Sequence, residues 1–146
     1  MTPPSAQHLN ALHMRAFGQA GAHGWREADF ARALADDAYT CLTQGAGYAV
    51  ARRVLDEADL MVIGVAPDAR RKGQGTALLT ALENTLAARG VAKLMLEVGG
   101  ANAAALAFYQ ARGFRQTGRR DGYYGIGARG TGGLGHAALL FEKALI

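Results

Sequence analysis

The chain has 146 residues, half of them apolar, with a formal net charge of +4 at pH 7 and a single cysteine, Cys41. This length predicts one domain, residues 1–146, with a real core, and one cysteine excludes an internal disulfide and a thiolate metal cluster. No apolar run approaches the roughly 20 residues that span a bilayer, and the first residues lack an export signal, so we expect a cytoplasmic protein with no membrane partner.

The N-terminal part predicts two helices. Ala6 to Phe17 carries apolar residues near helical spacing, and Ser5 is available as the N-cap. The run 18–24 contains too many glycines for us to expect a regular element there. A second helix is expected from about Arg26 to Ala35, with apolar residues on one face.

Three strands follow in a row. Tyr39 to Gln44 and Tyr48 to Leu55 flank the turn Gly45-Ala46-Gly47, which predicts a hairpin. A short turn then leads into Asp59 to Val65. We therefore expect three consecutive antiparallel strands.

A strand-to-helix transition then occurs twice. Thr76 to Arg89 predicts a helix with its leucines facing inward and Gly90 as the C-terminal stop. Lys93 to Val98 reads as a strand, and Asn102 to Arg112 as another helix.

Two closing strands enclose a glycine-rich loop. The strands are expected at Phe114 to Thr117 and at Ala138 to Ala144. The loop, Tyr124 to Gly135, should be mobile because its glycines give it high conformational entropy. We expect it to become ordered when an acceptor lies over Tyr123 and Tyr124.

The run from Arg70 to Thr76, which we call the anion seat, lies between the third strand and the following helix. Gly73 and Gly75 leave backbone N–H groups accessible, and the helix N-terminus adds its own unpaired N–H groups. Arg70, Arg71 and Lys72 bring three cations, which favours a pyrophosphate-bearing ligand. The run is not a P-loop and has only two of the three glycines of a dinucleotide fingerprint.

The anion seat, read as Arg-x-x-Gly-x-Gly, looks like the acetyl-CoA motif of the GNAT N-acetyltransferase superfamily. Further segments are similar in residue and spacing to the RimI-type N-terminal acetyltransferases: Leu55-Asp56-Glu57-Ala58, Leu96-Glu97-Val98, Asn102, Ala107-Phe108-Tyr109, Gly113-Phe114 and Gly118 to Tyr124. The resemblance implies an α/β fold in which a mixed, mostly antiparallel sheet, with helices on both faces, is splayed between Asp59–Val65 and Lys93–Val98.

The same resemblance implies an activity and a set of site residues. Members of that family transfer acetyl from acetyl-CoA to a protein's N-terminal amine, notably the alanine of ribosomal protein eighteen of the small subunit. By this resemblance Glu97 is the general base and Tyr109 the general acid. The expected acetyl-CoA contacts are Ile63, Gly64, Val65, Arg70, Arg71, Lys72, Gly73, Gln74, Gly75, Thr76 and Asn102; Tyr123 and Tyr124 would contact the acceptor.

The chemistry fits these two residues independently. An α-amino group has a pKa of about 8, so a base must remove a proton before it can attack a thioester. Glu97 alternates with Leu94, Leu96 and Val98, which predicts that its carboxylate faces away from the core. A phenol such as that of Tyr109, with a pKa near 10, can protonate the leaving thiolate.

Other catalytic arrangements are not expected. Ser5, the only serine, lies near the N-terminus, and Cys41 lies inside a predicted strand where an inert thiol is the ordinary case. The four histidines, His8, His13, His23 and His136, lack ligand spacing, so we expect no metal site.

The acceptor stays open at this point. Gly99-Gly100-Ala101, Val62 and His136 depart from the residues that related sequences typically carry. A GNAT enzyme acting on a small amine, such as a polyamine or amino-sugar, is one alternative; a non-catalytic CoA-binding or nucleic-acid-binding module is another. The cations cluster at 52–53, 70–72, 112–120 and 129, which favours an anionic ligand, but without the long aromatic-interleaved stripe of a nucleic-acid surface.

Overall fold

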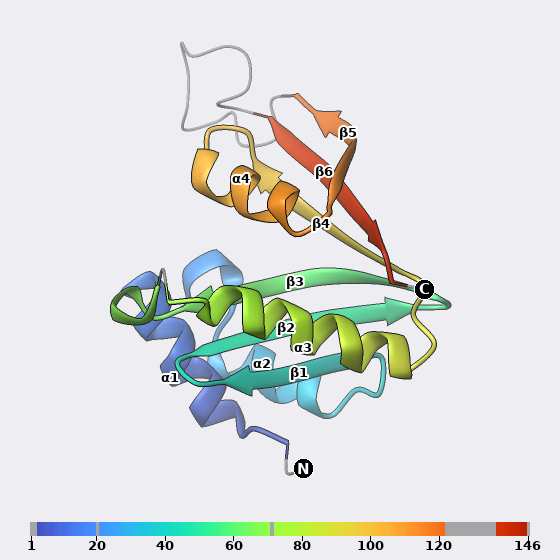
Figure 1. Ribbon diagram of the computed structural model, residues 1–146. Helices are drawn as coiled ribbons and strands as arrows, with labels where there is room; N and C mark the ends of the chain where they lie inside the picture. The colour runs from blue at the N-terminus through green and yellow to red at the C-terminus, as the bar shows by residue number, and fades with distance from the viewer. Residues whose placement is uncertain (1–2, 20, 71, 122–136, 146) are drawn as a thin grey trace.

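The computed structural model describes residues 3–19, 21–70, 72–121 and 137–145. These residues form helices on both faces of one sheet (Figure 1). The elements, in chain order, are α1 (Ala6–Phe17), η1 (Ala22–Gly24), α2 (Glu27–Leu34), β1 (Tyr39–Gln44), β2 (Gly47–Val54), β3 (Glu57–Val65), η2 (Pro67–Ala69), α3 (Gln74–Ala88), β4 (Lys93–Gly99), α4 (Ala103–Ala111), β5 (Arg115–Arg120) and β6 (Ala138–Ala144).

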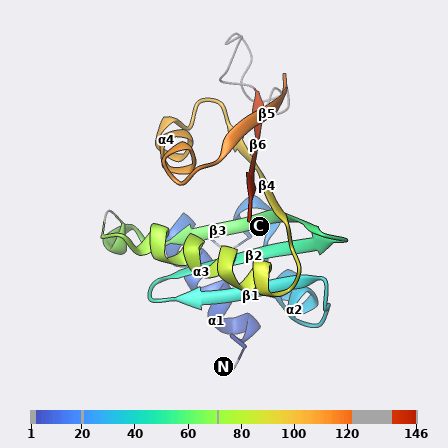
Figure 2. The same cartoon turned by 45° about the vertical axis from the view of Figure 1, so that its right-hand side comes forward.

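The six strands follow the order β1-β2-β3-β4-β6-β5, and every neighbouring pair is antiparallel except β3 and β4. That parallel pair is short. It comprises only Glu57 with Lys93, Ala58 with Leu94, and Asp59 with Met95. Beyond this point the two strands diverge, so β4, β6 and β5 turn away from the first three strands (Figures 1 and 2). The predicted splay is therefore confirmed.

Each face of the sheet has its own core. The leucines of α3, together with Leu94, Leu96 and Val98 of β4, form the larger cluster with α4. On the opposite face, α1 and α2 pack Leu9 and Phe30 against β2 and β3. The alternation expected for β4 is thus confirmed, since three of its side chains face the larger core and Glu97 does not.

A β-bulge interrupts β3 where the splay begins. Val50 of β2 pairs with Val62, and Ala51 pairs with Leu60, which leaves Met61 as an extra residue. A bulge disrupts the ladder locally and leaves its extra residue unpaired. It also shifts the alternation, so Leu60 packs on the α3 side while Val62 belongs to the α1–α2 core.

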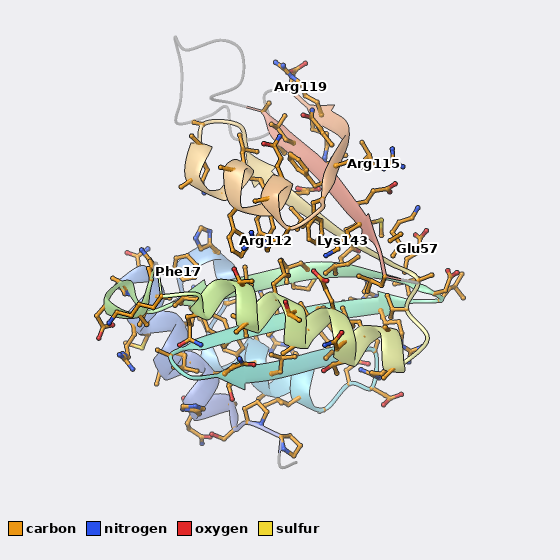
Figure 3. All side chains as sticks on the ribbon, viewed as in Figure 1. Phe17, Glu57, Arg112, Arg115, Arg119 and Lys143 are labelled. Carbon is orange, nitrogen blue, oxygen red and sulfur yellow. The ribbon has the colours of Figure 1, made fainter. Side chains whose placement is uncertain are left out.

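Side chains also join the two diverging parts of the molecule. Lys143 of β6 donates to Glu83 Oε1 of α3 at 2.8 Å, and Arg112 after α4 donates to Thr76 Oγ1 at the start of α3. Figure 3 shows Arg112 and Lys143 in the space between the upper strands and α3. These contacts hold α4 and β6 against the long helix.

The expected elements agree with the structure apart from their ends and from the run 18–24, where the short 3-10 helix η1 forms although no regular element was expected. β3 begins at Glu57 rather than Asp59, and α3 begins at Gln74 rather than Thr76. β5 runs to Arg120 because Arg119 and Arg120 still pair with β6, through Leu139 and Ala138. In the part of the chain that is described, no helix has the length and apolar character needed to cross a membrane.

Candidate active site

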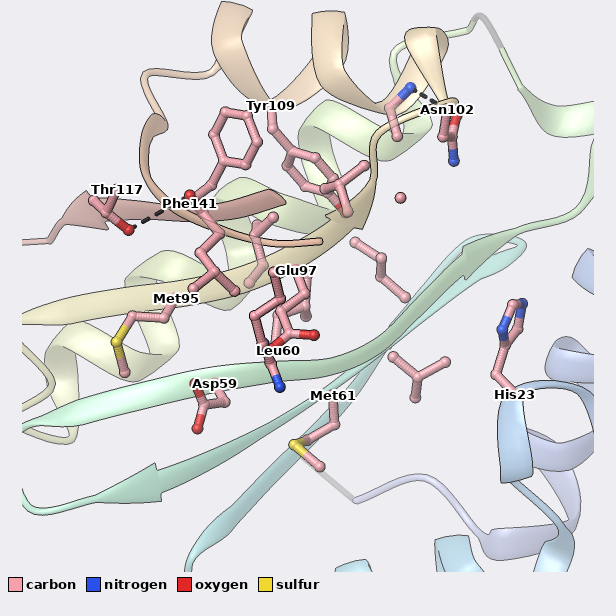
Figure 4. A pocket seen from close by; sticks show the side chains of 18 of the residues that line it. His23, Asp59, Leu60, Met61, Met95, Glu97, Asn102, Tyr109, Thr117 and Phe141 are labelled. Carbon is pink, nitrogen blue, oxygen red and sulfur yellow. Dashed lines mark hydrogen bonds and ion pairs between the residues drawn. The ribbon is translucent and has the colours of Figure 1, made fainter. Parts of the chain in front are cut away.

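A cleft of about 1010 Å³ lies where β3 and β4 diverge (Figure 4). Both strands line it, β3 through Asp59 to Ile63 and β4 through Met95 to Gly99. Phe17 and His23 close one side, and Asn102 lies on the other. The splay therefore produces a cavity bounded by elements from both parts of the sheet.

Glu97 projects into this cleft from β4. Because Leu96 and Val98 point into the core, the carboxylate between them points to the opposite face, where its side chain is 33% exposed. It forms an ion pair with Arg120 of β5. Arg120 was not singled out from the sequence as a site residue. The sequence pointed to Arg120 only as one residue of the segment 118–124. The strand register that brings it to Glu97 cannot be read from the sequence.

Tyr109 reaches the cleft from α4 and is only 8% exposed. Its ring makes edge contacts with Phe108 and Phe114, at centroid distances of 5.2 and 5.6 Å. Burial raises the pKa of Tyr109 to about 12, because the phenolate loses hydration inside the protein. The phenol therefore carries its proton throughout the neutral range.

The anion seat lies at the N-terminus of α3. Gly73 is the N-cap residue and has a φ of +75°, a left-handed conformation that favours glycine. No side chain caps this helix, so its first backbone N–H groups are not satisfied by a capping side chain. An anion placed here would meet those N–H groups and the positive end of the helix dipole.

Two side chains of the anion seat are turned toward the protein instead. Arg70 donates to the carbonyl of Val65 at 3.0 Å and to that of Ala16 at 2.8 Å, which ties the end of β3 to the end of α1. Gln74 binds Gln44 O and Ala46 N, at 2.9 and 3.2 Å. Both side chains therefore anchor the seat, and the backbone N–H groups of the seat and the charge of Arg70 remain available to a ligand.

The glycines near the seat also have packing roles. A Cβ on Gly75, which lies inside α3, would contact the Phe108 ring at 3.5 Å, so glycine here faces α4. A Cβ on Gly64 would come within 2.8 Å of Tyr48 and 2.9 Å of Ala16. Glycine at 64 is therefore required by the close approach of α1 to β3.

The remaining predicted contacts lie in different places. Ile63 lines the cleft, and Lys72, within the anion seat, is exposed. Asn102 caps α4 by accepting from Ala105 N at 3.1 Å, and it also lines the cleft. Val65 belongs to the end of β3 and packs at the margin of the larger core. Outside the described residues lie Arg71, Tyr123, Tyr124, His136 and the loop 124–135.

Cys41 is not part of this cleft. It lies on β1, partly buried beside the α1–α2 core, and burial raises the pKa of its thiol to about 11. A thiol with so high a pKa is a poor nucleophile at neutral pH. Within the described ranges, no group of three His, Cys, Asp or Glu side chains is placed to hold a metal ion.

The splayed sheet, with a cleft at its opening and an uncapped helix N-terminus beside it, is the architecture of an N-acetyltransferase. Residues 7–114 match the Acetyltransferase (GNAT) family, and the chain belongs to that family. The family expected from the anion seat is therefore confirmed.

Three relatives illustrate the similarity. A [ribosomal protein bS18]-alanine N-acetyltransferase of Escherichia coli (strain K12) is 41% identical over 125 residues, 83% of this chain and 80% of that protein. The crystal structure of the ribosomal-protein-S18-alanine N-acetyltransferase from Escherichia coli aligns with 99% of this chain and 92% of its own, at a TM-score of 0.76 and 33% identity. A GNAT family acetyltransferase from Elizabethkingia anophelis with acetyl-CoA bound shares the fold over 67% of each chain, at a TM-score of 0.59 and 21% identity.

Proposed function

We propose that this protein transfers acetyl from acetyl-CoA to the N-terminal amine of a protein, with alanine of ribosomal protein bS18 as the acceptor. The observation that carries the proposal is the cleft at the splay, which a carboxylate from β4 and a phenol from α4 both line. The 41% identity to the Escherichia coli enzyme supports the choice of acceptor. Such an acceptor is met in the cytoplasm, and one domain, residues 1–146, would carry the whole activity.

Acetyl-CoA would bind with its pyrophosphate at the N-terminus of α3, where Gly73 and the first backbone N–H groups of the helix are available. Lys72 adds an exposed cation there. The pantetheine arm would then run into the splay between β3 and β4. Backbone N–H groups near Ile63, beside the bulge at Met61, are left without a ladder partner on the β4 side and would polarise the thioester carbonyl.

The reaction is a direct transfer in a ternary complex. Glu97 accepts a proton from the acceptor ammonium, directly or through one water, and the neutral nitrogen attacks the carbonyl carbon. A new C–N bond forms, the C–S bond breaks, and the thiolate takes the proton of the Tyr109 phenol. The acetylated nitrogen loses its second proton, which returns through solvent to the Tyr109 phenolate, and Glu97 releases the first proton to water. The products are an N-acetylated terminus and CoA as a thiol.

The ion pair with Arg120 is part of this chemistry. A guanidinium on the carboxylate occupies the lone pairs that would take the proton. The acceptor ammonium therefore has to replace Arg120, or share Glu97 with it, before proton transfer. No covalent enzyme intermediate is needed, because Cys41 lies outside the cleft and its thiol stays protonated.

The test is to incubate the protein with acetyl-CoA and a library of peptides with varied N-termini, and to identify products by mass spectrometry. Polyamines and amino-sugars form parallel arms. We expect acetylation of peptides that begin with alanine. If only the small amines were acetylated, the acceptor would be a small amine and not a peptide. If no arm gave a product while calorimetry showed acetyl-CoA binding, the protein would be a CoA-binding module without catalysis.

A further inference from the structure

We propose that Asp59 determines acceptor specificity by binding a cationic side chain, lysine or arginine, at the second or third position of the acceptor peptide. This inference rests on the proposed function and extends it to a residue that has no role in the transfer itself. It is carried by the position of Asp59 in the strand register, by its lack of a partner, and by the side chains on either side of it.

The register places Asp59 and Glu97 on one face of the sheet. Asp59 pairs with Met95 in the last rung before β3 and β4 diverge, and Glu97 lies two residues beyond Met95 on the same face. Strand spacing and rise put the two Cα atoms about 8 Å apart. An extended peptide advances about 3.3–3.6 Å per residue, so a terminal amine at Glu97 brings the second or third residue to Asp59.

This face is also the one that the acceptor would use. Asp59 pairs with Arg52 and Val62 pairs with Val50, two residues apart on β2, so Asp59 lies on the α1–α2 side of the sheet. The N-terminus of α3, the proposed pyrophosphate site, belongs to the other side. Phe17 and His23 close the cleft on the Asp59 side. A peptide entering from there does not compete with acetyl-CoA.

The two carboxylates of the cleft differ in their partners. Glu97 is paired with Arg120, whereas the Asp59 carboxylate makes no hydrogen bond or ion pair with any residue of the described ranges. Arg52 lies across from it on β2 but does not form an ion pair with it. An exposed, unpartnered carboxylate inside a binding cleft attracts a cation, and in a partly desolvated site that attraction is stronger than on an open surface.

The neighbours of Asp59 fit the stem of a long basic side chain. Figure 4 shows the Asp59 carboxylate between the side chains of Met61 and Met95. Met61, the bulge residue, is 41% exposed although it is apolar. Lysine and arginine bury their methylene stems on apolar surface while the charged head stays hydrated or paired. The thioethers of Met61 and Met95 would hold the stem, and Asp59 the head.

The experiment compares peptides that share an N-terminal alanine and differ at one position. Lysine, arginine, glutamate or norleucine is placed at the second or the third residue, and kcat/KM is measured for wild type, Asp59→Asn, Asp59→Lys and the control Asp56→Asn. Asp56 is an exposed carboxylate in the turn before β3, outside the cleft. Calorimetry with acetyl-CoA and thermal melting report on cosubstrate binding and folding in every variant.

We expect wild type and Asp56→Asn to prefer the lysine and arginine peptides over norleucine by about 5- to 10-fold at one of the two positions. Asp59→Asn should lose this preference and leave the norleucine peptide within about 2-fold, and Asp59→Lys should favour glutamate. An unchanged preference in folded Asp59→Asn, or none in wild type, overturns the role of Asp59 while acetylation of alanine peptides upholds the proposed function. Failure of wild type to acetylate any peptide overturns both.

Discussion

At the scale of single residues, Glu97 and Tyr109 have different surroundings that suit the two different roles proposed for them. Glu97 is partly exposed and held by Arg120, which suits a group that exchanges protons with an incoming amine. Tyr109 is buried among aromatic rings and keeps its proton, which suits a donor. Their different surroundings follow from their positions, one on the free face of β4 and the other on the inner face of α4.

Glu97→Gln should lower the turnover of an alanine peptide by roughly 10²- to 10⁴-fold, because it keeps the size of the side chain and removes the base. The defect should shrink as the pH rises past about 8, where the free α-amine loses its proton without help. Steady-state rates from pH 6.5 to 9.5 measure this. Affinity for acetyl-CoA should be unchanged, and a wild-type rate in this variant would exclude Glu97 as the base.

Tyr109→Phe removes the donor instead, and a higher pH cannot supply the missing proton. Its defect should therefore persist or deepen over the same range. In wild type the phenol keeps its proton over this range, because burial raises the pKa of Tyr109 to about 12. If the two variants gave parallel pH profiles, their roles in the transfer would not be distinct.

At the scale of elements, α1 is joined to the segment that closes the cleft through a buried histidine. His13 is fully buried, and its Nε2 lies 2.7 Å from the carbonyl of Ala22, which can only accept, so Nε2 donates. Nδ1 then accepts from the Tyr48 hydroxyl of β2. The rings of Phe17 and His23, which line the cleft, meet edge to face at a centroid distance of 4.7 Å beside this contact.

This arrangement predicts acid sensitivity. Burial lowers the pKa of His13 below the usual 6.5, so the unfolded chain binds a proton more readily than the folded one. The stability that neutral His13 contributes is present above about pH 6.5 and is lost as the pH falls through the lowered folded pKa.

His13→Gln keeps a polar side chain that does not titrate. It should melt below wild type at pH 7.5, and the difference should narrow toward pH 5. Thermal melting between these pH values measures the effect, with His8→Gln, an exposed histidine of the same helix, as the control. Melting curves of wild type and His13→Gln that shift in parallel with pH would contradict a titrating His13.

At the scale of the whole molecule, a sheet that pairs β3 with β4 over only three residue pairs holds two diverging parts together. The larger core spans both parts, and polar contacts from β6 and α4 to α3 reinforce it. The cleft opens because β3 and β4 pair over so short a length. It also makes each bridging contact important to the geometry of the site.

The Lys143–Glu83 pair is the clearest case. It joins β6 to α3 at 2.8 Å with both side chains mostly buried. Lys143→Met should lower the free energy of unfolding by about 1–3 kcal/mol, because it leaves the Glu83 carboxylate without its partner. The double variant with Glu83→Gln should recover part of this loss in denaturant titrations. Additive losses in the double-mutant cycle would show that the pair is not coupled.

Much of this architecture is already present in the local sequence. The inward leucines of α3, the alternation that turns Glu97 away from the β4 core, and the hairpin around residues 45–47 depend on residues close in sequence, whose periods of 3.6 and 2 are properties of the backbone itself. The anion seat belongs here too, since a strand, two glycines and a helix start follow one another directly.

Only the tertiary structure determined the contacts between distant segments. Strand register brings Arg120 to Glu97 and places Asp59 in the last residue pair between β3 and β4. A slip of one residue in the register would send each of these side chains to the other face of the sheet. Arg70, a predicted acetyl-CoA contact, also donates to the carbonyls of Val65 and Ala16, which lie within its reach only after α1 packs on the sheet. Gly75 faces Phe108 only because α4 packs beside α3. Residue types and local periodicity thus show which groups are capable of the chemistry, and packing between distant segments brings them together.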